Sequence, residues 1–335
     1  MPLPERPLLI APDAFKGTFG AGAVAGAIGR GVERAGLLPP DLCPVADGGE
    51  GTLAVLVPQL GGELVGMTAR GPLGAPVPAQ FALVENGAVA IVETATASGL
   101  QLVPEGERDA FAASTYGTGQ LIAGAVQAGA GVVLVAVGGS ATSDGGAGAL
   151  QAIADAGGIE DARIVVLCDV RTPFEDAARV FGPQKGADAA TVERLRARLD
   201  ELAASFPRNP RGVPLSGCAG GLSGALWAVH GATLEPGAAW VLDTLDFDVR
   251  MRASRAVVTG EGRLDAQTLQ GKLVGEIGTR ARQAGVPLHA VVGSDALDGF
   301  GKRIIDLQLV LEATTLDELE QAGETIGRAL VDGSA

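Results

Sequence analysis

The sequence predicts an α/β protein in which a doubly wound parallel sheet is interrupted by a second α/β domain. Short aliphatic runs alternate with segments of helical spacing along the whole chain. Glycine-rich polar loops follow several of these runs, as is typical where a buried parallel strand leads into a helix. The chain has 335 residues, of which 47% are hydrophobic. That is enough for two domains with aliphatic cores.

The first domain is expected to hold five short, buried, parallel strands. Their aliphatic runs begin at Leu8, Leu42, Ala256, Leu288 and Leu307. The run over 8–11 precedes a helical segment over about 21–35, and the run over 42–46 precedes a helix that ends near residue 60. Thr315 and Glu318 have the spacing of a capping box at the start of the last helix. Strands that alternate with helices in this way form parallel sheets.

Between about Gly62 and Met251 the pattern changes, and we expect an inserted second domain there. This segment opens with short strands and turn signals that include Asn86–Gly87, a pair that favours a hairpin. Residues 191–206 have the amphipathic spacing of a helix. We therefore assign residues 1–62 and 252–335 to the first domain and residues 63–251 to the second.

The stretch VVLVAVGGSATSDGGAGAL, residues 132–150, is expected to be central to the inserted domain. Its run over 132–137 predicts a buried strand, and the residues up to Ala156 predict a helix. The loop between them contains Gly138, Gly139, Ser140, Thr142, Ser143 and Asp144. Such a loop presents free amides and a positive helix end to an anion, which favours a phosphate or substrate site. Alternatively, Asp144 only caps the helix and the glycines only turn the chain.

Charged residues follow other predicted strands, at the sheet edge where open α/β sheets bind ligands. The segments PDAFKG, DGGEGT and TGEGRLDAQ carry Asp13, Lys16, Asp47, Glu50, Glu261, Arg263 and Asp265. In DGGEGT the two acids could hold Mg²⁺ or take a proton from a hydroxyl. They could instead form a capping box for the next helix. Asp13 and Lys16 could likewise form no more than a surface ion pair.

Composition limits the possible partners and compartment. A formal net charge of −14 argues against nucleic acid or an anionic membrane surface. The three cysteines suit a reducing cytosol, and no apolar run is long enough to span a membrane. The few lysines all stand beside a glycine and are candidates for ligand contact: Lys16, Lys185, Lys272 and Lys302.

Several common functional motifs are absent from the sequence. It contains no G-x-G-x-x-G fingerprint, no Walker A motif and no G-x-S-x-G elbow. His230 and His289 stand in apolar segments and are expected to be structural. A nicotinamide-dependent oxidoreductase and a Ser-His-Asp hydrolase are therefore disfavoured.

Seven motifs occur in one order across almost the whole chain. They are APDAFKG, PVADGGEGT, STYGTGQL, GGSATSDGGAG, FGPQKGA, GCAGGLSGAL and VVTGEGRLDAQTLQGK. Together they closely resemble the class I family of bacterial glycerate kinases, which contains the glycerate 2-kinases. Four positions depart from the family pattern: Ala14, Thr94, Gln120 and Ser143.

This resemblance implies a cytoplasmic enzyme that transfers the γ-phosphoryl group of ATP to D-glycerate with Mg²⁺, giving 2-phosphoglycerate. It also implies a flavodoxin-like domain interrupted by a second α/β domain, with the active site in the cleft between them. A monomer or homodimer is expected. The alternatives are a glycerate 3-kinase that gives 3-phosphoglycerate, or a non-catalytic hydroxy-acid sensor on the same fold.

The resemblance also assigns site residues, because phosphoryl transfer depends on positioning and charge neutralisation. Asp47 is the expected base, Asp169 is the second choice, and Lys16 is expected to assist catalysis. The substrate is expected to contact Asp13, Lys16, Glu261 and Arg263, and the metal Asp144, Glu261 and Asp265. The nucleotide is expected to contact Gly138, Gly139, Ser140, Thr142, Gly220, Gly221, Lys185 and Lys272.

Overall fold

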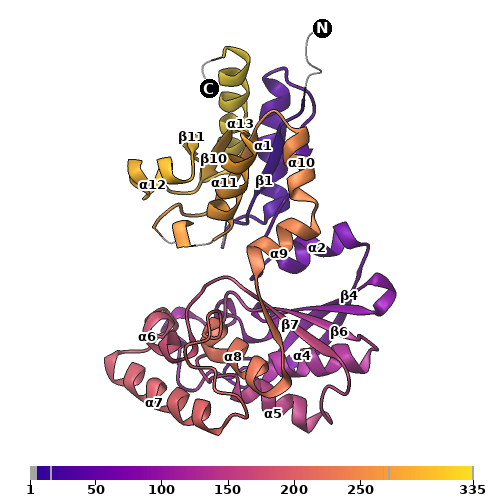
Figure 1. Cartoon of the computed structure of the whole chain (residues 1–335), viewed down its shortest axis with the longest axis vertical. Coiled ribbons are helices and arrows are strands. Elements are labelled where there is room, and N and C mark those ends of the chain that lie inside the picture. Colours follow the sequence, from indigo (N-terminus) through magenta and orange to yellow (C-terminus); the bar gives the residue numbers. More distant parts are fainter. Residues whose placement is uncertain (1–5, 16, 267, 271, 334–335) are drawn as a thin grey trace. The chain divides into compact units, whose positions relative to one another are not determined.

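The computed structural model (Figure 1) describes residues 6–15, 17–266, 268–270 and 272–333. The chain forms two compact units, one made of Met1–Asp47 with Ala238–Ala335 and the other of Gly48–Gly237. The first unit is thus built from both ends of the chain, and the second is one continuous segment. Each unit has its own sheet and its own core. The expected α/β fold with an interrupted first domain is confirmed.

The sheet of the first unit is entirely parallel. Its strands lie in the order β11-β10-β9-β1-β2. Their bounds are β1 (Leu9–Pro12), β2 (Asp41–Leu42), β9 (Val257–Glu261), β10 (Leu288–Val292) and β11 (Leu307–Glu312). Numbered along the chain, this is the 2-1-3-4-5 order of flavodoxin-like sheets, whose switch point lies between the first and third strands.

All five expected strands are present, but the second is shorter than predicted. The strand expected over 42–46 ends as a regular ladder at Leu42. The amides of Cys43 and Val45 still donate to carbonyls of the β1 segment. Pro12 of β1 has no amide to donate back to this segment, so the ladder is incomplete beyond Leu42.

Helices cover both faces of this sheet. They are α1 (Ala21–Arg34), α9 (Gly237–Thr244), α10 (Phe247–Ala253), α11 (Leu273–Ala284), α12 (Gly299–Ile304) and α13 (Leu316–Val331), with a 3₁₀ turn at Thr268–Gln270. On one face, Ile10 and Val258 share a buried cluster with residues of α1 and α13. On the other, Ala290 and Val292 pack with Val274 of α11. The capping box predicted for the last helix is present at the start of α13.

Helices α1 and α13 lie side by side (Figure 1) and approach closely at glycines. A Cβ atom added to Gly31 would lie 1.9 Å from the carbonyl oxygen of Glu320. One added to Gly323 would lie 2.1 Å from that of Ile28. The two backbones can therefore meet only because neither glycine carries a side chain.

The second unit has a mixed sheet in the order β3-β4-β5-β6-β7-β8. The bounds are β3 (Glu63–Arg70), β4 (Pro76–Val84), β5 (Val89–Glu93), β6 (Val132–Ala136), β7 (Arg163–Cys168) and β8 (Thr233–Pro236). Strands β3 to β5 are antiparallel and β5 to β8 are parallel. The hairpin predicted at Asn86–Gly87 joins β4 to β5 through a 3₁₀ turn.

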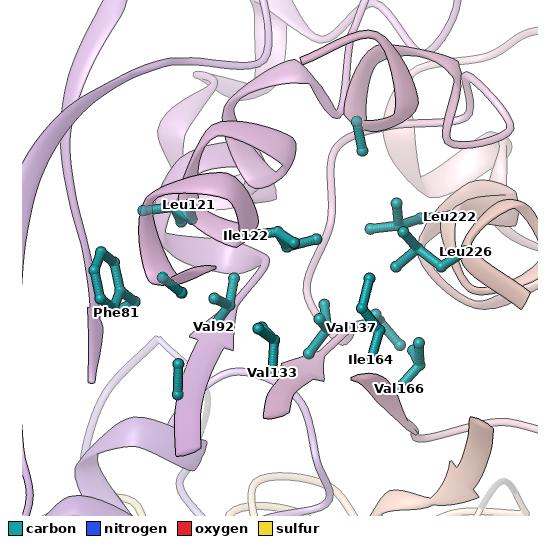
Figure 2. Close-up of a cluster of buried hydrophobic side chains, with 14 of the residues drawn as sticks. Phe81, Val92, Leu121, Ile122, Val133, Val137, Ile164, Val166, Leu222 and Leu226 are labelled. Atoms are coloured by element: carbon teal, nitrogen blue, oxygen red, sulfur yellow. The ribbon is translucent and has the colours of Figure 1, made fainter. Parts of the chain in front are cut away.

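The helices of the second unit enclose its aliphatic core. They are α2 (Thr52–Leu60), α3 (Ala95–Ser98), α4 (Tyr116–Gln127), α5 (Ala147–Asp155), α6 (Ala177–Phe181), α7 (Ala189–Ser205) and α8 (Cys218–His230). Side chains from the sheet meet those of α4 and α8 in the buried cluster of Figure 2, which labels Phe81, Val92, Leu121, Ile122, Val133, Val137, Ile164, Val166, Leu222 and Leu226. A smaller cluster around Phe174 joins α6 to α7.

The units divide at 47/48 and 237/238, whereas the sequence placed boundaries at 62/63 and 251/252. Helix α2 packs against β4 and β5, so it belongs with the second unit. Helices α9 and α10 belong with the first, because Arg280 of α11 forms ion pairs with Asp243 and Asp248. Within the described part of the chain, no helix combines the length and apolar character needed to cross a membrane.

Candidate active site

The first unit contains a pocket of about 350 Å³ at the carboxyl ends of neighbouring strands. Asp13 directly follows β1 and Glu261 ends β9, and these strands pair side by side. This is the switch point of the sheet, where doubly wound folds bind ligands. The lining residues are Asp13, Ala14, Asp47, Glu261, Gly262, Arg263, Asp265, Lys272 and Leu273.

The pocket is rich in acids and also carries two cations. Asp13 and Asp47 are buried, and Asp13 Oδ1 accepts a 2.7 Å hydrogen bond from the Ala14 amide. Arg263 is largely exposed and lies 3.4 Å from Asp265. Lys272 is the N-cap residue of α11. The pocket can therefore offer both carboxylate oxygens and positive charge to one small ligand.

Glu261 has a strongly perturbed acidity. Burial raises its pKa to about 7, and the negative charges of Asp265 and Asp47 add to the increase. The hydrogen bond from Thr268 Oγ1 (2.7 Å) and the charge of Lys272 oppose it. Thr268 Oγ1 also accepts a hydrogen bond from the amide of Asp265, so one buried hydroxyl fixes both acidic positions. Such a perturbed group in a cleft is typical of a functional site.

The pocket's donor set fits a hard cation such as Mg²⁺. Carboxylate oxygens are its preferred protein ligands, and mutual repulsion of the crowded acids would be relieved by a cation. Among the described residues, no group of three His, Cys, Asp or Glu side chains has the spacing of a complete metal cage. Mg²⁺ commonly binds one or two carboxylates and completes its shell with water and phosphate, which this pocket allows.

In the second unit, a buried lysine lies beneath the loop that follows β6. Lys185 is only 3% exposed, and its Nζ donates to Ser140 Oγ (3.0 Å) and to the Thr142 carbonyl (2.6 Å). Burial lowers the pKa of the Lys185 amine to about 8, against the opposing charges of Asp144 and Asp169. An ammonium has three donors. The third has no partner within the described residues and remains available to a ligand oxygen.

Asp144 in the same loop is fully engaged. Its carboxylate accepts hydrogen bonds from the amide and the hydroxyl of Thr115 and from the amides of Gly146 and Gly148. This pattern favours the alternative stated for Asp144, in which it caps α5. Thr115, from the motif STYGTGQL, was not singled out from the sequence, because the residues lie 29 positions apart.

The glycine-rich start of α8 lies directly against this loop. Ala219, Gly220 and Gly221 all have left-handed backbone angles, so the regular helix begins only after them. The carbonyl of Gly220 accepts from the Gly145 amide at 3.0 Å, and a Cβ added to Gly220 would lie 2.2 Å from the Thr142 carbonyl oxygen. Ala219 is a rare residue type in this conformation, and strained backbone of this kind concentrates at functional sites.

A further cluster forms where the loop before α2 meets the ends of β6 and β7. A Cβ added to Gly138 would lie 2.7 Å from Gly49 Cα and 3.5 Å from Asp169 Oδ2. One added to Gly139 would lie 3.3 Å from Glu50 Oε2. Glycines at these positions thus let two acids approach the turn. The alternative capping box of Asp47 and Glu50 is not formed, because α2 starts after Gly51 and has no side-chain cap of its own.

The expected site residues fall into two groups. The first unit gathers the pocket residues Asp13, Asp47, Glu261, Arg263, Asp265 and Lys272. The second unit holds Gly138, Gly139, Ser140, Thr142, Asp144, Asp169, Lys185, Gly220 and Gly221. Lys16 lies outside the described residues.

Comparisons with a family model, with curated proteins and with solved structures all find similarity to glycerate kinases. The model of the glycerate kinase family matches residues 8–156 and 154–322. A glycerate kinase of Halalkalibacterium halodurans is 37% identical over 95% of this chain and 94% of its own length. A glycerate 2-kinase of Escherichia coli is 35% identical over 86% and 85%, respectively. The crystal structure of a putative glycerate kinase 2 from Salmonella typhimurium superposes with a TM-score of 0.81, at 31% identity over 98% of this chain and 99% of that one.

Proposed function

The chain belongs to the glycerate kinase family, and from this premise we propose that it transfers the γ-phosphoryl group of ATP to the 2-hydroxyl of D-glycerate. The name of the Escherichia coli relative, a glycerate 2-kinase, supports the 2-position. The observation that carries the proposal is the acid-rich pocket at the sheet's switch point. It combines buried carboxylates with cationic side chains in a volume suited to a small hydroxy acid.

Within this pocket we assign the base to Asp47. It is buried, and it shares the pocket with cations that can hold a carboxylate. A base must lie within hydrogen-bond reach of the proton it removes, and a small pocket limits how far a bound hydroxyl can lie from Asp47. Arg263 is our candidate for binding the glycerate carboxylate, because a guanidinium matches a carboxylate bidentately. Lys16 and Asp13 remain proposed as its neighbours in substrate binding, and Asp169 as the second choice for the base.

For the nucleotide we propose the loops around Gly138–Thr142 and Gly220–Gly221. Both loops are rich in glycine, whose backbone can approach phosphate oxygens closely. Lys185 would fix the first loop with two donors and offer its third to a phosphate. Lys272 is proposed as a further cation for the phosphate oxygens.

For the metal we propose Glu261 and Asp265. Mg²⁺, when bound, would neutralise charge on the phosphate oxygens of ATP. Asp144 we assign to bracing the loop after β6, since donors from Thr115 and from the start of α5 already occupy its oxygens. The described cysteines are free, which supports our proposal that the enzyme works in the reducing cytosol.

Phosphorus NMR of a reaction containing ATP, Mg²⁺ and D-glycerate tests this function. We expect resonances of ADP and 2-phosphoglycerate to appear together. Formation of 3-phosphoglycerate would correct the regiochemistry but retain the kinase. Binding of glycerate without any ATP consumption would instead support the alternative of a hydroxy-acid sensor.

A further inference from the structure

The loop Gly48–Gly51 is held by a carboxylate from a distant part of the sequence. Glu93, the last residue of β5, is buried. Its Oε1 accepts a 3.0 Å hydrogen bond from the Gly51 amide, and its Oε2 accepts a 3.1 Å bond from the Leu53 amide. Gly51 is the N-cap residue of α2 and has no side chain to cap it, and Leu53 lies in the first turn of the helix. From the end of β5, Glu93 thus supplies the hydrogen-bond acceptors that the N-cap glycine of α2 cannot provide.

A second bond holds the same loop from inside. The hydroxyl of Thr52 donates to the Gly49 carbonyl at 2.7 Å. Since Thr52 lies between the two residues bound by Glu93, the loop and the helix start form one bonded unit. A Cβ added to Gly138 would lie 2.7 Å from Gly49 Cα, and one added to Gly139 would lie 3.3 Å from Glu50 Oε2, so both residues lie close to this turn. The position of Glu50 at this turn therefore depends on the anchor that Glu93 provides.

We propose that Glu93 is a positioning residue for phosphoryl transfer: it locks the loop Gly48–Gly51 against the Gly138–Gly139 turn. This inference rests on the proposed kinase function. In the sequence, the loop begins directly after Asp47, the proposed base. A loss of register here should lower the rate of the chemical step, because small displacements of reacting groups are costly. Glu93 itself would not contact substrate.

The decisive variant is Glu93→Gln, which keeps the shape but can offer only one acceptor oxygen to the two amides. We expect deuterium exchange in the peptide spanning residues 48–53 to accelerate. We also expect kcat to fall about 10- to 100-fold with little change in KM for either substrate. Glu93→Asp retains a carboxylate and should recover much of both effects. If Glu93→Gln does not fold, deuterium exchange of residues 48–53 and kcat are measured on Glu93→Asp instead.

A matched control is available in the other unit. Glu318 also accepts backbone amides at a helix start, from Thr314 and Thr315, but it lies at α13 and is exposed. Glu318→Gln should lower stability while kcat and KM stay at wild-type values. A purely structural role for Glu93 would give the same result as this control.

Two outcomes would overturn the proposal. One is unchanged exchange of residues 48–53 in Glu93→Gln. The other is accelerated exchange with wild-type kcat. If the wild-type protein does not phosphorylate glycerate, the proposed function fails, and the exchange measurement still decides whether Glu93 anchors the loop.

Discussion

At the scale of single residues, Asp47 lines the pocket at the switch point and is the proposed base. Asp47→Asn removes the proposed proton acceptor and changes the size of the side chain very little. We expect kcat to fall by about 10²- to 10⁴-fold, as is typical when a general base is lost. Steady-state kinetics and thermal unfolding should be measured on the same preparation, so that loss of fold is separated from loss of chemistry.

The control for this variant is Asp317→Asn. Asp317 is exposed in the first turn of α13, away from the lining residues of the pocket. Its kinetics should match those of the wild type. A folded Asp47→Asn enzyme with a near-normal rate would transfer the role of base to another acid, with Asp169 as the next to be tested.

His289 of β10 predicts how stability depends on pH. The side chain is fully buried, and neither ring nitrogen has a hydrogen-bond partner in the described structure. Burial lowers the pKa of His289 from 6.5 to about 4. Between these values the unfolded chain binds a proton that the folded chain does not. Stability contributed by neutral His289 is therefore complete above pH 6.5 and is lost as the pH falls towards 4.

The expected loss is about 3 kcal/mol, the free-energy equivalent of this shift in pKa. Urea unfolding at several pH values from 7.5 to 4 would measure it, with His289→Val as the comparison. The variant should lose less stability on acidification than the wild type, by up to this amount. If the free energy of unfolding fell equally with decreasing pH in both proteins, His289 would not be the cause of the pH dependence.

At the scale of elements, the contact between α1 and α13 depends on glycine. Gly31→Ala would place a methyl group far inside contact distance of the Glu320 carbonyl, so the two helices must separate. We expect a destabilisation of at least about 2 kcal/mol, measured by urea unfolding, as overpacked sites typically show.

Gly22 on the same helix provides the matched control. A Cβ added there meets nothing within 4 Å. Gly22→Ala should therefore stabilise the protein by up to about 1 kcal/mol, because alanine has the higher helix propensity. If both substitutions stabilised the protein, the close packing of α1 on α13 would be refuted.

The elements that the sequence predicted well are those marked by local signals. Short aliphatic runs predicted β1, β6, β9, β10 and β11, and the Thr315–Glu318 spacing predicted the capping box of α13. The prediction was too long for β2, because Pro12 of the neighbouring strand β1 has no amide to continue the ladder, and residues 42–46 alone do not show this. The left-handed conformation at the start of α8 leaves no local signal in the sequence, because close contact with the loop after β6 determines it.

The site was predictable to the extent that topology determines it. Parallel strands end at one edge, so Asp13 after β1 and Glu261 on β9 had to be neighbours once those strands paired. Partners distant in sequence were not predictable. The bonds of Asp144 to Thr115 and of Glu93 to Gly51 span 29 and 42 positions and leave no local pattern.

At the scale of the whole molecule, the division into two units predicts which fragment folds alone. Residues 48–237 form one continuous unit with its own core and include α2, which packs on β4 and β5. We expect this fragment to unfold cooperatively in urea. The fragment 63–251 lacks α2 and carries α9 and α10 without Arg280, their partner in the first unit. Its unfolding midpoint should be lower, and equal midpoints would favour the boundaries predicted from the sequence.

The pairing of β1 with β9 has a consequence for synthesis on the ribosome. Leu9 lies opposite Val257, so the first strand to emerge must wait for one made much later. At ordinary elongation rates the delay is on the order of 10 to 50 s. During this interval the middle of the nascent polypeptide can already fold, while the amino-terminal strand stays exposed to chaperones. Folding in this protein is therefore expected to begin in the middle of the chain and to finish with the unit that its two ends form.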